Sequence, residues 1–340
     1  MTDGGRISVH SSIDEIDRDE WSAVVAAADA PAFYSHAFVQ AYERVPLQPT
    51  EAFYYLVFGS PAVAVLPAYL QSTDDPLGYV SGLGLPDREP GDLLLMTHVA
   101  HCYDTLIAAR PGHLTRALVD RACETLAELA GHAGAKWFAF LNVDGSGTTA
   151  GHLEAAGLLK LPMTARFSKD IAGYPTFEDF VAEIPTRKGR WKYRSSLARA
   201  QHSGLTISDA DPVRGAAGAV ELCRQTTARH GTAGYYPAQF HDFVALASEI
   251  IKVTEVRIDG GLVSATISLL DPRRFHLWAG GVDRELAQGL PSNFTLILHP
   301  SVVDAIRMER PVLEAGRSNE TTKQRFNLDP RPLFAYVARV

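Results

Sequence analysis

The chain has 340 residues, 46% of them apolar and 21% charged, so it is long enough for two globular domains. This composition excludes a collagen, a coiled coil and a disordered chain. Three cysteines, an odd number, are typical of a reducing compartment, and we expect a cytoplasmic protein. We expect no signal peptide and no transmembrane segment, and the net charge of −7 argues against DNA binding.

The predicted elements of the first half begin with two short helices, one around Trp21 and one around Phe38. A hairpin of two strands follows, then a loop rich in Pro, Gly and Asp, an amphipathic helix, a strand, a short helix and a strand. These later elements lie at residues 53–58, 62–66, 71–91, 114–129, 136–143, 153–156 and 165–171.

The second half repeats that order. Two helices precede a hairpin whose turn, Asp259-Gly260-Gly261, is a strong signal, and then come a strand, a helix and two strands. These elements lie at residues 216–230, 238–250, 252–258, 262–270, 275–280, 293–308, 312–314 and 333–340. We therefore predict an α/β protein with two domains of one topology, residues 1–171 and 172–340, each with a mixed sheet covered by helices.

One segment breaks the acidic balance of the chain. Six cations and no acid occur within 13 residues, namely Arg187, Lys188, Arg190, Lys192, Arg194 and Arg199. The rest of the chain therefore carries a net charge of −13. Such dense like charges repel one another, and a ligand with phosphate groups would offset the repulsion. A solvated helix face is the alternative interpretation, and the sequence leaves both open.

The order of elements resembles the GNAT acetyltransferase fold, and two such domains in tandem resemble the Fem-type peptidyltransferases and their N-acyltransferase relatives. The segment Ala155-Ala156-Gly157-Leu158 resembles a signature at the end of a GNAT domain. Residues 192–204 resemble a basic Fem-type helix of the form K-x-R-x-x-I-x-x-A-x-x-x-G, so we expect a basic helix at 187–204 to open the second domain. Glu314 and Gly316, followed by Lys323, resemble a second Fem-type segment.

The resemblance implies transfer of an acyl group to an amine. Fem-type enzymes use aminoacyl-tRNA as donor and an amine on a cell-wall precursor as acceptor, whereas other relatives use acyl-CoA. We therefore expect no bound cofactor, aminoacyl-tRNA as co-substrate with its acceptor end on the six cations, and a small-molecule amine as acceptor. An acyl-CoA-dependent N-acyltransferase and a non-catalytic protein that binds a nucleotide or a tRNA end are the alternatives.

One missing motif favours aminoacyl-tRNA over acyl-CoA. Single-domain acetyltransferases bind the CoA pyrophosphate with a loop of the form [QR]-x-x-G-x-[GA] at a helix N-terminus. Residues 109–113 and 288–293 stand at the corresponding places and do not fit this pattern. Pro291 also lacks a backbone N–H donor.

Two residues are candidates for catalysis. Lys323 would stabilise the oxyanion that forms when an amine attacks an ester, although a surface lysine explains its position equally well. Glu314 ends a strand and would take the proton of the attacking amine, although a capping or salt-bridged carboxylate is the alternative. The candidate residues for the acceptor pocket are Trp278, Tyr235, Tyr236, Asn293 and Arg317, for which core packing and helix capping are the alternatives.

Metal binding is not expected. His98, His101 and Cys102 form an H-x-x-H-C motif, but a metal site needs three or four converging ligands and no second motif with suitable spacing accompanies this one. The oligomeric state is open from the sequence.

Overall fold

The structure of the chain is a computed structural model. It describes residues 6–72, 80–89, 91–99, 101–232, 234–290, 293–317 and 319–340, without the side chains of 293–295. The chain divides into two compact units, described separately below: unit 1 is Met1–Thr164 with Pro332–Val340, and unit 2 is Ala165–Arg331.

Unit 1 is a mixed sheet with helices. Its helices are α1 (Arg18–Ala27), α2 (His36–Arg44), α3 (Arg116–His132) and α4 (Thr148–Ala155), with short 3-10 turns at Ile13–Glu15, Ala32–Tyr34 and Ser81–Leu83. Its strands are β1 (Ile7–His10), β2 (Thr50–Phe58), β3 (Ala64–Ser72), β4 (Leu93–Thr97), β5 (Ala108–Ala109), β6 (Trp137–Asp144) and parts of β7 (Leu159–Asp170) and β13 (Asp329–Arg339). The strand order is β1-β2-β3-β4-β6-β13-β7, and β5 pairs with β3.

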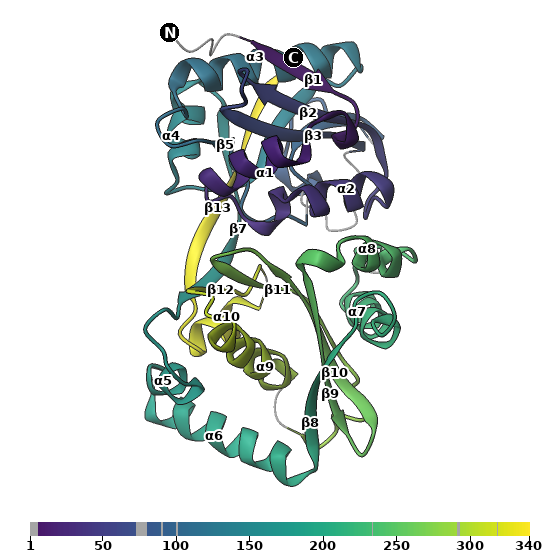
Figure 1. Cartoon of the computed structure of the whole chain (residues 1–340), viewed down its shortest axis with the longest axis vertical. Helices are drawn as coiled ribbons and strands as arrows, with labels where there is room; N and C mark the ends of the chain where they lie inside the picture. The colour runs from purple at the N-terminus through teal and green to yellow at the C-terminus, as the bar shows by residue number, and fades with distance from the viewer. Residues whose placement is uncertain are drawn as a thin grey trace. The chain divides into compact units, whose positions relative to one another are not determined.

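Unit 2 has the same kinds of elements. Its helices are α5 (Phe177–Ala182), α6 (Arg187–His202), α7 (Ala217–Arg229), α8 (Phe240–Leu246), α9 (Asn293–Arg307) and α10 (Glu320–Arg325), with a 3-10 turn at Ser248–Ile250. Its own strands are β8 (Leu205–Ala210), β9 (Ile251–Ile258), β10 (Gly261–Leu270), β11 (Arg274–Val282) and β12 (Val312–Glu314). The order is β7-β12-β11-β10-β9-β8 (Figure 1).

The two units share one layout, which confirms the predicted fold class. In unit 1, β2, β3 and β4 pair antiparallel, and α3 then carries the chain across to β6, which is parallel to β4. In unit 2, β9, β10 and β11 pair antiparallel, and α9 carries the chain to β12, which is parallel to β11. Each unit therefore has a meander followed by one helical crossover.

The borders of the units differ from the predicted boundary between residues 171 and 172. Residues 165–171 belong to unit 2, where β12 pairs with β7, and residues 332–340 belong to unit 1, where β13 pairs with β6. The alternation of apolar residues identifies a strand but not its pairing partner, so the sequence could not place either strand.

The hairpin turn between β9 and β10 follows from its residues. Asp259 and Gly260 join β9 to β10 with φ angles of 48° and 81°. Both values lie in the left-handed region that a tight two-residue hairpin turn of this kind requires, and Asp-Gly adopts it at little cost. The Asp-Gly motif thus sets the pairing of β9 with β10.

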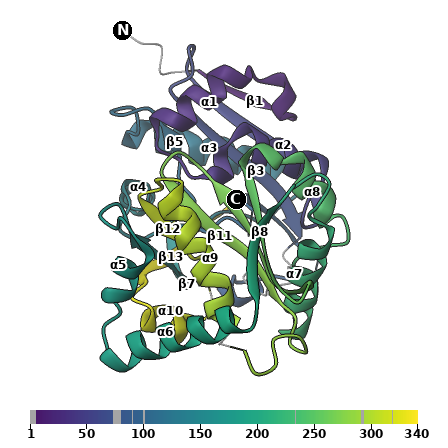
Figure 2. The same ribbon diagram turned by 60° about the horizontal axis from the view of Figure 1, so that its bottom comes forward.

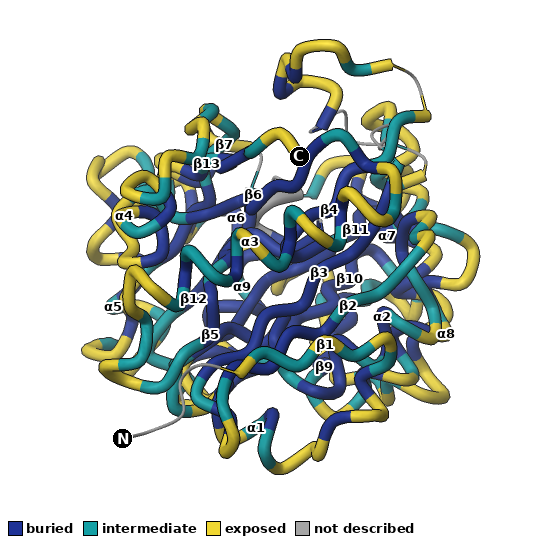
Figure 3. Tube along the Cα trace, turned by 90° about the horizontal axis from the view of Figure 1, so that it is seen from above, coloured by how far each residue is buried: buried dark blue, intermediate teal, exposed yellow. Residues whose placement is uncertain are grey.

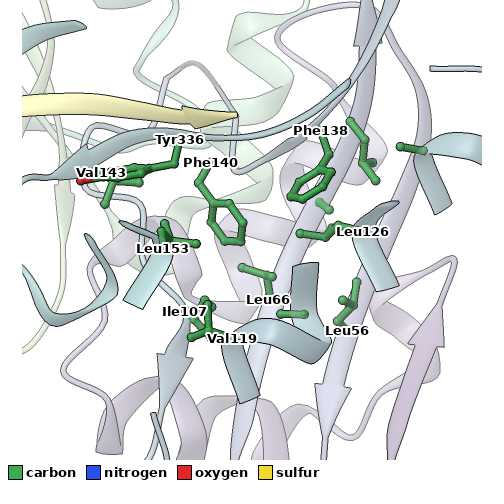
Figure 4. Packing of buried hydrophobic residues seen from close by; sticks show 14 of the residues in the cluster. Leu56, Leu66, Ile107, Val119, Leu126, Phe138, Phe140, Val143, Leu153 and Tyr336 are labelled. Carbon is green, nitrogen blue, oxygen red and sulfur yellow. The ribbon is translucent and has the colours of Figure 1, made fainter. Parts of the chain in front are cut away.

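The core of unit 1 lies between its strands and helices. Leu56, Leu66 and Phe140 from the strands pack against Val119 and Leu126 of α3, as Figure 4 shows. On the other face, rings from α1 and α2 contact rings of β2 and β3, such as Trp21 with Tyr55 and Tyr42 with Tyr69. In Figure 3 the central strands are accordingly coloured as buried.

The sheet of unit 2 is also covered on both faces. Phe275 and Leu313 point to the face where Leu298 of α9 and Tyr193 of α6 complete a buried cluster. On the opposite face, rings of α8 contact Trp278. Figure 1 shows α9 and α10 on one side of the strands and α7 and α8 on the other.

Helix α9 contains a proline, and a serine on the sheet compensates for it. Pro300 has no N–H to donate to the carbonyl of Leu296, four residues earlier. The hydroxyl of Ser264 on β10, fully buried, lies 3.3 Å from that carbonyl oxygen and donates to it instead. The helix therefore continues through the proline while it packs on the sheet.

Candidate functional site

Strand β12 places Glu314 inside unit 2. Leu313 belongs to the cluster on the α9 face, so Glu314, the next residue, points to the opposite face. In the register of the sheet Glu314 lies beside His276 of β11 and Ser168 of β7. A strand end flanked by a crossover helix is where α/β sheets commonly carry functional groups.

Glu314 forms an ion pair with Arg166. Nη1 of Arg166 donates to Oε1 of Glu314 at 2.5 Å, and the two residues are 9% and 2% exposed. In a buried, hydrogen-bonded pair of this kind, each charge offsets the cost of removing the other from water, so the pair is stable only when both charges are present. The structure therefore shows Glu314 as a paired carboxylate, and its role as a proton acceptor stays a prediction.

Sequence reasoning missed Arg166. It lies 148 positions before Glu314, and a single arginine inside a predicted strand carries no signal of its own. Only the antiparallel pairing of β7 with β12 brings the two side chains together.

A second buried pair lies next to the first. Nε2 of His276 is 2.8 Å from Oδ2 of Asp271, and His276 is fully buried. Oδ1 of Asp271 accepts hydrogen bonds from the backbone N–H groups of Arg273 and Arg274, which fixes the turn between β10 and β11. Because His276 and Glu314 are register partners, the two buried pairs stand side by side in the sheet.

Lys323 is a buried lysine that holds the turn after β12. It lies on α10, is 3% exposed, and donates from Nζ to the carbonyl oxygens of Gly316 at 3.0 Å and Arg317 at 2.6 Å. Its Nζ also lies 5.3 Å from the centre of the Phe167 ring. The sequence Thr-Thr-Lys-Gln-Arg gives no sign of this burial, since polar residues surround the single position that points inward on a short helix.

The surroundings of Lys323 change its charge state. Its pKa is lowered to about 7, mainly by burial and also by the charge of Arg317, while the carboxylate of Glu314 acts in the opposite direction. Both the ammonium and the neutral amine are therefore populated near neutral pH. A group with a pKa near the working pH is suited to proton transfer and to the stabilisation of developing negative charge.

Three of the five candidate acceptor residues lie together. Tyr235 and Tyr236, before α8, have ring centroids 4.6 Å apart, and the hydroxyl of Tyr236 lies 3.4 Å from the carbonyl oxygen of Trp278. Trp278 occupies an irregular position of the ladder, where the register between β10 and β11 shifts. Tyr236 also stacks on Phe240 at 4.3 Å, so the cluster contains packing residues as well as candidates.

The other two candidates lie elsewhere. Arg317 is half-buried in the turn after β12, where its carbonyl accepts from Lys323. Asn293 begins α9, and its side chain lies outside the described residues.

The six cations of the basic segment lie on α6. The helix begins where Thr186 accepts a hydrogen bond from the N–H of Gly189 at 3.0 Å, and it buries Tyr193, Ser196 and Ala200. Figure 2 shows α6 along the edge of unit 2 beside α5. The ring of Tyr193 lies 5.1 Å from that of Phe326 at the end of α10, so the basic helix and the helix of Lys323 share one side of the sheet.

Two of these cations have partners. Arg190 donates to the carbonyl of Ile184, and Arg194 forms an ion pair with Glu178 of α5 at 2.8 Å. The remaining four, Arg187, Lys188, Lys192 and Arg199, are exposed and have no ion pair within the part of the chain that the structure describes.

Other polar features are separate from this site. A hollow of about 240 Å³ lies near the C-terminal end of α9, and its Lys252 and Arg307 are already paired with Asp209 and Asp304. Among the described residues, no three His, Cys, Asp or Glu side chains gather where they could hold a metal ion. Within the same residues, no helix has both the length and the apolar character needed to cross a membrane.

Comparison with known proteins shows a family model that the second part of the chain matches. Residues 187–324 match the sequence model of the family described as "Acetyltransferase (GNAT) domain". This range begins at α6 and includes both Glu314 and Lys323. A comparison of the sequence with curated proteins found no significant match.

Solved structures are similar to the chain along nearly its whole length. FemX is 10% identical with a TM-score of 0.64, covering 95% of this chain and 96% of FemX. A tandem GNAT protein from the clavulanic acid biosynthesis pathway is 13% identical with a TM-score of 0.57, covering 98% of both chains. L-PGS from Bacillus licheniformis is 10% identical with a TM-score of 0.57, covering 94% of this chain and 90% of L-PGS. These likenesses establish the tandem GNAT fold.

Proposed function

We propose that this chain, an acyltransferase that carries a GNAT domain at residues 187–324, transfers an aminoacyl group from aminoacyl-tRNA to an amine. The acceptor would be a small metabolite or a cell-envelope precursor. The observation that carries the proposal is α6, whose four unpaired cations lie on the same side of unit 2 as Lys323.

The cations of α6 support a donor with several phosphates. Arg187, Lys188, Lys192 and Arg199 are held close together on one helix and are not neutralised by acids of the described chain. Phosphate oxygens would remove their mutual repulsion, and both side-chain types bind phosphate well. The Fem-type resemblance of residues 192–204 adds aminoacyl-tRNA as the specific donor.

The reaction needs little chemistry from the protein. The nitrogen of an uncharged amine attacks the carbonyl carbon of the aminoacyl ester, the new C–N bond forms, and the bond from that carbon to the ribose oxygen breaks. The proton lost by the nitrogen ends on the ribose oxygen. No covalent enzyme intermediate is required, so positioning and charge stabilisation supply the acceleration.

Lys323 would supply the positive charge in this scheme. It lies beneath the turn at Gly316 and Arg317, in a buried position where its charge acts over a longer distance than in water. Glu314, paired with Arg166, would accept the proton of the attacking amine, and Trp278, Tyr235 and Tyr236 would line the acceptor pocket.

An acyl-CoA donor is the second candidate, because the family matched by residues 187–324 is one of acetyltransferases. A direct assay separates the two donors. Hydroxylamine serves as a small amine acceptor, and hydroxamate formation is measured with radiolabelled aminoacyl-tRNA and with acetyl-CoA. We expect product from aminoacyl-tRNA, whereas turnover with acetyl-CoA in the absence of tRNA would contradict the proposed donor.

A variant tests the role of Lys323 in the same assay. Lys323→Met removes the charge and retains the length of the side chain, and we expect kcat to fall about 100-fold or more. Lys252→Met is the matched control, since Lys252 is also a buried lysine of unit 2 but lies on β9. Equal loss of activity in both variants would show a general effect of removing buried lysines.

A further inference from the structure

Trp191 is exposed in the middle of α6. It is 68% exposed, whereas Trp21, Trp137 and Trp278 are all at most 9% exposed. Among the large apolar side chains that are exposed in the described chain, it is the only aromatic one. Within that part of the chain no ring or cation covers its indole.

The neighbours of Trp191 on the helix surface are mostly cations. Residues three and four positions away on a helix lie next to each other, and for Trp191 these are Arg187, Lys188, Arg194 and Ser195. An aromatic face surrounded by positive charge is the arrangement with which proteins bind single-stranded nucleic acids. There the cations hold the phosphates, and the ring stacks on an unpaired base.

The rest of this outer face is polar or small. Further along the helix the exposed residues are Arg194, Ala198, Arg199, Gln201 and His202, none of which is a large apolar residue. A helix that lies in a membrane surface needs a continuous apolar face of large side chains. One tryptophan among cations does not supply such a face, which favours a nucleic acid over a lipid surface.

The length of the cationic face favours a chain of nucleotides over a single one. Arg187 and Arg199 are twelve residues apart, which corresponds to roughly 18 Å along the helix axis. One nucleotide placed on Trp191 reaches the nearest cations but does not extend along the whole row of cations from Arg187 to Arg199. A strand of several nucleotides can contact Lys192 and Arg199 as well.

We propose that Trp191 is a stacking site for an unpaired base of a single-stranded RNA end, with its phosphates on the neighbouring cations. The inference rests on the proposed function, because aminoacyl-tRNA is the donor there and ends in a single strand. The inference extends the proposed function in two ways. It names Trp191 as the residue that contacts an unpaired base, and it predicts that single-stranded RNA is bound in preference to a duplex.

Intrinsic fluorescence gives a direct readout. Because the other tryptophans are buried, Trp191 supplies the emission that an added solute can quench. The probe is a single-stranded RNA of 12 nucleotides, compared with the same RNA annealed into a blunt duplex. We expect the single strand to quench the exposed emission of the wild-type chain, and Trp191→Phe to lose this quenching while it still binds the RNA.

Affinity is then measured by anisotropy of the fluorescein-labelled RNA. We expect Trp191→Ala to weaken single-strand binding about tenfold and Trp191→Phe to stay within about threefold of wild type. The slope of affinity against salt should be unchanged, because no charge is removed. Leu246→Ala is the control, because Leu246 is an exposed apolar residue of unit 2 on another helix.

Three results would overturn the stacking site. The first is that Trp191→Ala binds the single strand as tightly as wild type does. The second is that this variant loses duplex binding and single-strand binding to the same extent. The third is that the wild type binds phosphatidylglycerol vesicles but does not bind RNA. Each is distinguishable from failure of the proposed function. Turnover with acetyl-CoA alone would remove the tRNA donor, whereas RNA quenching by Trp191 is measured without any turnover.

Discussion

Arg166 and Glu314 are ion-paired inside unit 2 at 2.5 Å, although they are 148 positions apart in the chain. Both side chains are almost without solvent contact. Removal of one charge takes the ion-pair partner away from the other charge, which stays buried, and this is the costly way to break such a pair.

The first prediction follows from this pair. Arg166→Met should lower the free energy of unfolding by about 3–5 kcal/mol, and the double variant Arg166→Met/Glu314→Leu should recover much of that loss. Urea unfolding measures both. Arg116→Ala is the control, because its ion pair with Asp120 is exposed and is worth at most about 1 kcal/mol. A double variant as unstable as the single one would contradict this account.

The second prediction concerns pH and Lys323. The pKa of this lysine is about 7 in the folded chain and near its ordinary value of 10.5 in the unfolded chain, because burial disfavours the ammonium. Between these values the unfolded state binds more protons, so this group makes the folded state more stable as pH rises from about 7 towards 10.5.

Urea unfolding from pH 6.5 to 10 in wild type and Lys323→Met isolates this contribution. The stability of wild type minus that of the variant should rise with pH above 7, by up to about 1.4 kcal/mol for each pH unit. A difference that falls with pH would show that the ammonium is the form favoured by the fold.

The third prediction concerns the charges of α6. Lys188→Ala/Lys192→Ala removes two exposed cations, so the slope of log affinity for single-stranded RNA against log salt should decrease by about 1.4. Arg116→Ala/Arg121→Ala removes the same charge from α3 of unit 1 and should leave the slope unchanged. Equal slopes in all three proteins would place the RNA away from α6.

The fourth prediction concerns the contact between α7 and β11. A Cβ atom at Gly281 would lie 2.4 Å from the backbone carbonyl carbon of Leu222, which a helix cannot easily move. Gly281→Ala should therefore destabilise the chain by about 1–3 kcal/mol. Thermal unfolding of this variant is compared with that of Gly151→Ala.

The control for that variant is expected to have the opposite effect. Gly151 lies inside α4, and a Cβ atom there meets nothing within 4 Å. Alanine should stabilise the helix by about 0.5–1 kcal/mol. A tolerated Gly281→Ala would mean that α7 shifts on the sheet without cost.

Local features of the fold were predictable from the sequence. The basic helix was expected at 187–204 and is found at Arg187–His202, where the side chain of Thr186 caps its N-terminus. The hairpin at Asp259 and Gly260 and the repeated order of elements also follow from short-range patterns, and the structure confirms the fold class.

Long-range relationships were not predictable. The pairing of Arg166 with Glu314 and the burial of Lys323 depend on strands and turns that meet only in the folded chain. The pattern of Thr-Thr-Lys-Gln-Arg is that of a surface segment, and no propensity indicates that one lysine turns inward. The proposed roles of Lys323, Glu314 and the acceptor residues stay predictions.

The place of β13 has a consequence for biosynthesis. Residues 332–339 lie between β6 and β7 in unit 1, although every other strand of that unit is made before residue 165. During synthesis, the sheet of unit 1 therefore lacks β13 until all residues of unit 2 have been made. The half of the protein that is synthesised first therefore needs the last residues of the chain to complete its sheet.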